Sequence, residues 1–187
     1  MEPLHLESHP ATPCASVRSL TAAVLRIGDE LALRYRLDGA LGELRLPAPA
    51  TPAFADRLWE HTCFEAFVGA TDGGAYDELN FSPSGEWAHF AFSSYREHAK
   101  GSRADALARS APRAAWCRGA NALALDVSVD LAALGRERTA SLRLGISAVV
   151  EDRDGRRSYW ALAHHAEAPD FHDARAFTLR LEPVSAE

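Results

Sequence analysis

Between positions 58 and 95 the chain contains three short runs of β-type residues separated by two turn sequences, and this segment constrains the fold most strongly. The turn sequences are TDGG at 71–74 and SPSG at 82–85. Glycine, proline, aspartate and serine each favour chain reversal, so these two clusters predict two tight connections. Three runs joined in this way predict consecutive antiparallel strands.

Side chains on a strand point alternately to two faces, so each run separates into two sets. One set is almost entirely apolar and consists of Phe64, Ala66, Val68, Leu79, Phe81, Ala88, Phe90 and Phe92. The other set is mixed and consists of Cys63, Glu65, Phe67, Tyr76, Glu78, Asn80, Trp87, His89 and Ala91. We expect the first face to join the core. The second face combines carboxylates, an amide, an imidazole and aromatic rings, which suits a small polar ligand better than plain solvent.

The rest of the chain carries the same kind of pattern. Further strands are expected at 17–27, 31–37, 41–46, 121–130, 142–150, 158–163 and 174–181. Other segments are expected to be an irregular lead-in at 1–16, a proline-rich loop at 47–56, a helix at 97–111, and a turn from Asp130 to Gly135. About ten strands with one or two short helices predict an all-β antiparallel β-sandwich, immunoglobulin-like or jelly-roll-like, with residues 1–187 in one domain.

The composition is that of a folded domain and gives no sign of a nucleic-acid partner. The chain has 187 residues, of which 47% are hydrophobic and 25% charged. This is an ordinary globular composition, and the length is sufficient to bury a core without disulfides. The net charge is −6, Lys100 is the one lysine, and there is no basic cluster. A positively charged footprint for phosphates is therefore missing, and we expect no nucleic-acid partner.

The cysteines and the first residues indicate a reducing compartment. Cys14, Cys63 and Cys117 are an odd number without a CxxC spacing, so they predict neither a disulfide framework nor a zinc knuckle. The start of the sequence, MEPLHLESHP, lacks the basic and apolar parts of a secretory signal. No stretch approaches the roughly 20 apolar residues of a membrane span. We expect a cytoplasmic protein with no membrane partner.

Two segments resemble a known superfamily. The first is WEHTCFEAFV followed by YDELNFSPSGEWAHF, and its matching positions are Trp59, Glu65, Phe67, Tyr76, Glu78, Asn80, Pro83, Ser84 and Gly85. This pattern resembles the superfamily of DOMON-like domains and family 9 carbohydrate-binding modules. The second segment, YWALAHHAEAPDFHDARAF, is similar to the closing hairpin of the bacterial DOMON-like subgroup. The likeness spans residues 59–177.

The resemblance implies a β-sandwich whose relatives bind sugars or haem and act as binding modules rather than as catalysts. Some relatives ligate haem iron with methionine and histidine. The one methionine of this chain is Met1, so that ligation cannot be built from the interior of the sequence. The resemblance is more specific for fold than for function.

Several side chains are candidates for ligand contacts. Trp59, Trp87 and Trp160 would stack against a pyranose ring, although a tryptophan also packs well beneath a loop. Glu65, Glu78, Asn80 and His89 would bond sugar hydroxyls. The alternative is that the carboxylates are enclosed and bonded to backbone amides or to Arg34 or Arg36. A glycosidase would need Glu65 and Glu78 about 5 Å apart in a cleft.

The histidines allow more than one interpretation. His61, His164 and His172 are expected at the rim of the site, and the alternative is a metal or haem site built from histidines alone. Cys63 with His61 would suit a nucleophile and base, but a small buried thiol is the more common role. No nucleophile elbow, P-loop or dinucleotide-binding motif is present.

These observations favour a non-catalytic domain that binds a small polar ligand, with a sugar as the favoured ligand and with no cofactor. Three other classes remain open. The first is a haem or divalent-metal module that uses histidine ligands. The second is a protein-interaction domain, and the third is a hydrolase, which is favoured least. The sequence does not assign the oligomeric state.

Overall fold

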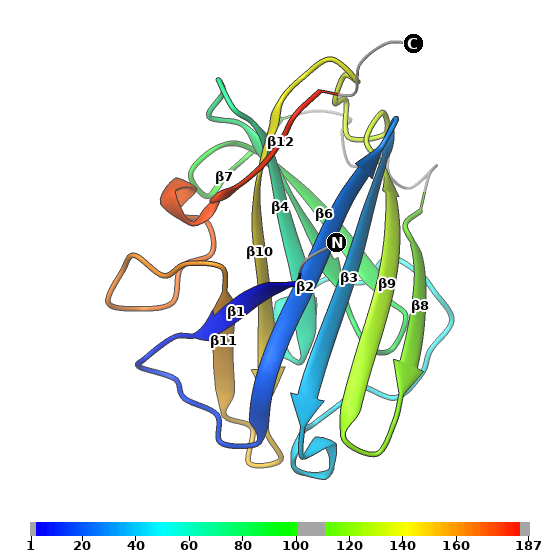
Figure 1. Ribbon diagram of the computed structural model, residues 1–187, viewed down its shortest axis with the longest axis vertical. Coiled ribbons are helices and arrows are strands. Elements are labelled where there is room, and N and C mark those ends of the chain that lie inside the picture. The colour runs from blue at the N-terminus through cyan, green and yellow to red at the C-terminus, as the bar shows by residue number, and fades with distance from the viewer. Residues whose placement is uncertain (1–2, 101–110, 184–187) are drawn as a thin grey trace.

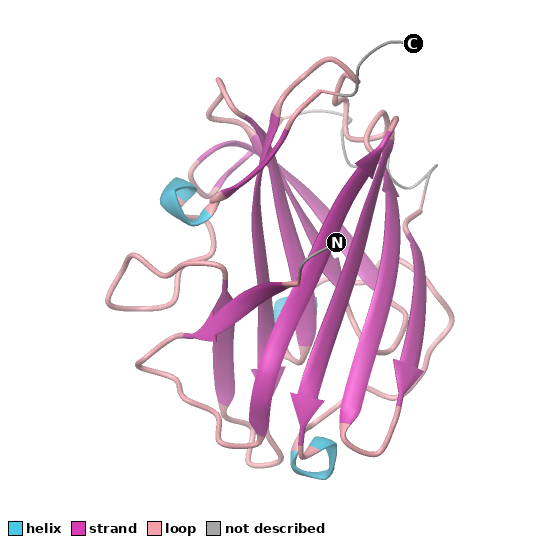
Figure 2. Ribbon diagram, in the orientation of Figure 1, coloured by secondary structure: helices cyan, strands magenta, loops and turns pink. Residues whose placement is uncertain are grey.

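Twelve β-strands and three 3-10 turns make up the computed structural model, which describes residues 3–100 and 111–183 (Figures 1 and 2). The strands are β1 (Leu4–Ser8), β2 (Val17–Ile27), β3 (Glu30–Gly39), β4 (Cys63–Ala70), β5 (Tyr76–Phe81), β6 (Trp87–Ser94), β7 (Glu97–His98), β8 (Arg113–Arg118), β9 (Ala122–Asp130), β10 (Leu142–Glu151), β11 (Arg157–Ala161) and β12 (Leu179–Leu181). The turns are η1 (Leu41–Glu43), η2 (Leu58–Glu60) and η3 (Ala174–Ala176). Every pairing between these strands is antiparallel, which confirms the predicted fold class.

The strands form two layers that are connected through β1. The hydrogen-bonded order is β7-β6-β5-β4-β10-β11-β1-β2-β3-β9-β8, and β12 also pairs with β10. Strand β1 pairs with β2 through residues 4–6 and with β11 through residues 7–8, so it passes from one layer to the other. Below, the first layer means β2, β3, β9 and β8, and the second layer means β4–β7 and β10–β12. Figure 1 shows the first layer lying in front of β4, β6 and β10.

The core lies between the two layers. Tyr35 on β3 contacts Phe64 on β4 with ring centroids 5.3 Å apart, and the Tyr35 hydroxyl donates to the backbone carbonyl of Glu65 at 2.7 Å. Along β3 the inward residues are buried, whereas Arg34 and Arg36 point outward and pair with Asp126 and Asp38. The two arginines are therefore committed on the outer surface of the first layer. They do not contact Glu65, contrary to one of the alternatives considered from the sequence.

Three predicted segments differ from the structure. Residues 4–8 of the expected irregular lead-in form β1, because Leu6 is buried where the strand crosses between layers. The expected strand at 41–46 is η1 followed by a single bridge from Leu44 to Asp152. The expected strand at 174–181 begins as η3, since Asp173 accepts a hydrogen bond from the backbone of Arg175, and only Leu179–Leu181 pairs as β12.

The helix expected at 97–111 is wrong at its start. Glu97–His98 is β7, which pairs with β6 after a tight turn in which Arg96 has a φ of 54°. Most of the expected helix, 101–110, lies outside the described residues. The turn after Asp130 is as predicted, because the Asp130 carboxylate accepts the backbone N–H of Ala132 and Gly135 closes the turn with a φ of 66°. Within the described ranges no helix has the length and apolar character needed to span a membrane.

Candidate functional site

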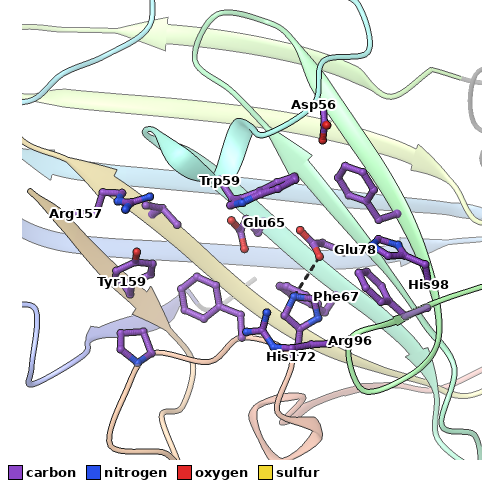
Figure 3. A pocket seen from close by; sticks show the side chains of 15 residues that line it. Asp56, Trp59, Glu65, Phe67, Glu78, Arg96, His98, Arg157, Tyr159 and His172 are labelled. Carbon is purple, nitrogen blue, oxygen red and sulfur yellow. Dashed lines mark ion pairs between the residues drawn. The ribbon is translucent and has the colours of Figure 1, made fainter. Parts of the chain in front are cut away.

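A cavity of about 490 Å³ lies on the outer face of the second layer. Its floor is formed by β4, β5, β6, β10 and β11, and three segments that are distant in sequence cover it, namely the η2 region, the turn into β7 and the loop around residues 169–172. Figure 3 shows the side chains converging on this space from the strands and from the loops. The cavity is separated from the core by the second layer itself. Alternation along a strand therefore decides which residues reach it.

Two carboxyl groups form the floor. Glu65 on β4 pairs with Asn80 on β5, and Phe67 pairs with Glu78, so Glu65 and Glu78 are diagonal neighbours on one face. Their residues are only 2% and 6% exposed, although both line the cavity. The regular ladder between β4 and β5 thus brings together two acidic side chains that are 13 positions apart in the chain.

Glu78 is held by neutral donors on both of its oxygens. The Asn80 amide donates to Oε1 of Glu78 at 2.7 Å, and His172 Nε2 lies 3.5 Å from Oε2. Asn80 itself is fully buried and supports Glu78 from below. Burial raises the pKa of Glu78, and the hydrogen bond from Asn80 and the charge of Arg96 oppose that rise.

His172 is part of a directed chain of hydrogen bonds. The backbone N–H of Arg96 donates to the Tyr76 hydroxyl at 3.1 Å, which leaves the Tyr76 proton to be donated to His172 Nδ1 at 2.7 Å. The network therefore assigns the ring proton to Nε2, facing Glu78. Burial, followed by the charge of Arg96, lowers the pKa of His172 to about 4. The imidazole is consequently neutral at neutral pH.

Glu65 is less well satisfied than Glu78. Its Oε2 accepts only a long hydrogen bond of 3.5 Å from the Ser147 hydroxyl. Its Oε1 is buried and has no hydrogen-bond partner among the described residues. Burial and the neighbouring charge of Glu78 raise the pKa of Glu65 well above its usual range. Two adjacent carboxyl groups in a desolvated site favour retention of a proton, and Glu65, the more deeply buried, is the one that we expect to hold it.

Aromatic rings surround this acidic floor. Trp59 on η2 is 36% exposed and meets the edge of Phe90 with ring centroids 5.4 Å apart. Phe92 also lines the cavity, and His98 stacks on it at 4.6 Å. Tyr159 contributes a ring from the other side (Figure 3). The ring of Phe171, which also lines the cavity, lies 5.9 Å from that of Tyr159.

The rim carries two arginines, of which one forms an ion pair and the other forms none with a described residue. Arg96 pairs with Asp170 at 2.9 Å and also donates to the Tyr95 hydroxyl at 3.3 Å. Asp170 in turn accepts from the Tyr95 hydroxyl, and these bonds together with the charge of Arg96 lower its pKa despite partial burial. The Arg157 side chain lines the opposite part of the cavity and forms no ion pair with another described residue. The Arg96–Asp170 pair thus fastens the covering loop to the turn before β7.

The structure brings together four of the predicted site residues at the cavity and holds a fifth directly behind them. Trp59, Glu65, Glu78 and His172 line the cavity, and Asn80 orients Glu78. This grouping follows from the strand alternation expected for β4 and β5, together with the loop that carries His172.

The face predicted for β6 was wrong. Phe81 pairs with Trp87 and Leu79 with His89, so Trp87 and His89 lie on the core side of the second layer. Phe90 and Phe92 occupy the cavity side instead. Both sets of β6 side chains contain aromatic residues, so the strand alone does not fix its orientation. The length of the connection at 82–86 does, because a shift of one residue exchanges the two faces.

The remaining predicted residues are not part of the cavity lining. Trp160 is 7% exposed, packs in the core, and donates to the Ser158 hydroxyl at 3.0 Å. His61 bonds Glu151 at 2.7 Å, and His164 bonds the backbone carbonyl of Glu7 at 2.9 Å. The three predicted histidines are thus in separate places. Across residues 3–100 and 111–183 no group of three or more histidine, cysteine, aspartate or glutamate side chains is arranged to hold a metal ion.

Sequence reasoning missed several cavity residues. Tyr159 stands next to Trp160 on β11, and the alternation that buries Trp160 turns Tyr159 to the cavity. The signal was present in the sequence, because adjacent residues of a strand face opposite sides and Tyr159 directly precedes Trp160. Arg96, Arg157 and Phe171 gave no comparable signal, because their positions depend on how loops fold over the sheet.

No known family model matches the sequence, and no curated protein matches it either. Solved structures do resemble it. A candidate carbohydrate-binding protein from Bacteroides uniformis has 16% identity and a TM-score of 0.67, with 91% of this chain and 80% of that chain covered. The fold is also similar to a family 9 carbohydrate-binding module from Caldicellulosiruptor kristjanssonii in complex with glucose, at 6% identity and a TM-score of 0.63, covering 97% and 86% of the two chains.

A structure of a family 9 module from the same organism in complex with cellotriose gives 7% identity and a TM-score of 0.58, covering 94% of this chain and 76% of that chain. The chain therefore has a fold like that of family 9 carbohydrate-binding modules. The DOMON part of the resemblance stays a prediction. At these identities the likeness shows the fold alone.

Proposed function

We propose that this chain is a non-catalytic sugar-binding domain and that the cavity on the outer face of the second layer is its binding site. The observation that carries the proposal is a hydrogen-bonding floor, formed by Glu65 and Glu78, inside a wall of aromatic rings. A pyranose needs both features, because its C–H faces stack on aromatic rings and its hydroxyls require polar partners. The cavity volume also lies within the range of about 300–1,000 Å³ that is typical of small-ligand sites.

Different residues would contact different parts of the sugar. Trp59 has an exposed ring beside the opening and would stack on the sugar. Glu78 is preoriented by Asn80 and His172, so it would accept a hydrogen bond from a sugar hydroxyl without losing side-chain freedom on binding. The similar folds that were solved with glucose and with cellotriose support the ligand class. Affinity for one sugar should be modest, because each hydroxyl exchanges bonds with water for bonds with protein.

Calorimetric titration with a panel of hexoses and disaccharides tests the proposal. We expect saturable binding with dissociation constants between about 10 µM and about 1 mM. Trp59→Ala should weaken that binding by about tenfold or more, since it removes the stacking surface. Phe54→Ala is the matched control, because Phe54 is an exposed aromatic residue outside the cavity lining. An absence of binding across the panel, or equal losses in the two variants, would contradict the proposal.

A further inference from the structure

The cavity floor holds two carboxyl groups that form no ion pair with an arginine or lysine of the described residues, although Arg96 and Arg157 line the same cavity. The donors that reach Glu65 and Glu78 are the Ser147 hydroxyl, the Asn80 amide and the neutral His172 ring. The Arg96 guanidinium is paired with Asp170 at the rim. A buried carboxylate is ordinarily matched by a positive group or a metal ion. This floor is matched by neither within the described residues.

One carboxyl oxygen on the floor lacks a hydrogen-bond partner among residues 3–100 and 111–183. Oε1 of Glu65 is buried and has no hydrogen-bond partner in the described part of the chain, although Glu65 lines the cavity. Figure 3 shows the Glu65 and Glu78 carboxyl groups facing the same space below Trp59. Buried polar atoms of folded proteins are nearly always bonded. A donor supplied by the ligand would complete this position.

A protonated amino group meets these conditions better than a hydroxyl. It offers three N–H donors and a positive charge, whereas a hydroxyl offers one donor and no charge. Hydrogen bonds between charged partners are roughly twice as strong as neutral ones. The surrounding rings of Trp59, Phe67 and Phe90 add to the preference, because aromatic faces attract cations. A ligand carboxylate at the same place would be repelled by Glu65 and Glu78.

We propose that the sugar bound in this cavity carries a protonated amino group, as in an amino hexose, and that this group is held by the free carboxyl oxygen of Glu65 beside Glu78. The inference rests on the sugar-binding function proposed above and specifies the chemical class of the sugar. It assigns Glu65 as the residue that selects charge, because the proton that Glu65 holds in the free protein would be released to solvent when the ammonium group binds. Trp59 and the other rings keep the role of holding the pyranose.

Three forms of one sugar separate the charge of the amino group from its size. Calorimetric titration at about pH 6.5 would use glucosamine, glucose and N-acetylglucosamine, followed by the galacto and manno series. We expect the amino sugar of at least one series to bind about tenfold more tightly than its neutral parent. The N-acetyl form keeps the nitrogen but removes the charge, so it should lose the advantage.

Glu65→Gln keeps the shape of the side chain and removes its ability to become a carboxylate when an ammonium group binds. In this variant the preference for the amino sugar should fall to within about twofold of the neutral sugar. Glu151→Gln is the matched control, because Glu151 is another buried glutamate of the second layer that lies outside the cavity and pairs with His61 and Arg45. It should retain the preference. Circular dichroism would confirm that both variants are folded.

The outcomes distinguish this inference from the proposed function. Equal or tighter binding of the neutral sugars in every series would overturn the amino-sugar assignment and leave sugar binding intact. An unchanged preference in Glu65→Gln would also overturn the assignment. If neither neutral nor amino sugars bind, both proposals fail. If cyclohexylamine binds but no sugar of the panel does, both proposals are likewise overturned, because the cavity would then be a site for organic cations and not for sugars.

Discussion

Two acidic residues that are adjacent in the sequence, Asp77 and Glu78, illustrate the difference between the two faces of the second layer. On the core side, Asp77 is fully enclosed, and its two oxygens are taken by His89 at 2.9 Å and by Arg136. On the cavity side, Glu78 meets only an amide and a neutral imidazole, and Glu65 beside it keeps one oxygen free. Both faces contain a buried acid and a histidine. A guanidinium pairs with the acid on the first face, whereas none within the described residues pairs with Glu65 or Glu78 on the second face, where we propose that a ligand binds.

The largest expected effect comes from removing the guanidinium on the core side. Arg136→Ala leaves Asp77 as a buried charge with only His89 as partner, and we expect a loss of about 3–5 kcal/mol in the free energy of unfolding. Urea denaturation followed by circular dichroism measures it. Arg34→Ala is the control, because Arg34 and Asp126 form an exposed pair whose loss should leave the midpoint unchanged within error. Equal effects of the two substitutions would remove the contrast between the faces.

Two tryptophans sharpen the same comparison. Trp160→Ala should cost about 3–5 kcal/mol, because its buried ring packs in the core. Trp59→Ala should cost less than about 1 kcal/mol, because the ring is 36% exposed at the cavity opening. The same denaturation series gives both values. A large loss of stability for Trp59→Ala would mean that this ring serves packing rather than a ligand.

His172 gives a pH-dependent test of the cavity side. Its pKa is lowered from 6.5 to about 4, so the stability that the neutral ring contributes is present above pH 6.5 and is lost as the pH falls through about 4. His172→Asn should therefore flatten the decline of the unfolding free energy over that interval. NMR titration of the ring protons in the wild type supplies the direct readout. A midpoint near 6.5 would contradict the assigned network.

Glu65 should produce a slope of opposite sign. Its pKa is raised in the folded state, so its contribution to stability is fully present below the unfolded value of about 4.3 and is lost as the pH rises through the folded value. The stability of Glu65→Gln relative to the wild type should therefore increase as the pH rises from about 4.3 through neutrality. Thermal melts across this range test the sign. A difference that does not change with pH would show that the carboxyl group is not protonated in the folded protein.

The fold was largely predictable from sequence because short alternating runs between turn clusters allow few architectures. Strands such as β3 and β9 alternate regularly along their whole length, and their positions were predicted closely. Strand β1 was missed because it is short and follows a proline near the start of the sequence. The error at 174–181 has a similar cause, since only three of those residues pair with β10.

The site was only partly predictable. Glu65 and Glu78 follow from alternation on β4 and β5, where one set of side chains is clearly more polar. Trp87 and His89 were placed on the wrong face, because the orientation of β6 is set by the connection before it and not by its own sequence. His172, Arg96 and Phe171 come from segments that fold over the sheet. Their positions at the cavity depend on tertiary structure and cannot be predicted from local sequence patterns.

Paired strands form the floor of the cavity, and three separate loops form its cover. The residues of the cover are therefore distinct from the paired strands that hold the fold together. Substitutions in the 169–172 loop or around η2 alter the cover without disturbing a ladder hydrogen bond. Loop replacement is therefore the direct engineering route to a new ligand preference on this scaffold. The two acidic residues of the floor would keep their positions when the covering loops are replaced.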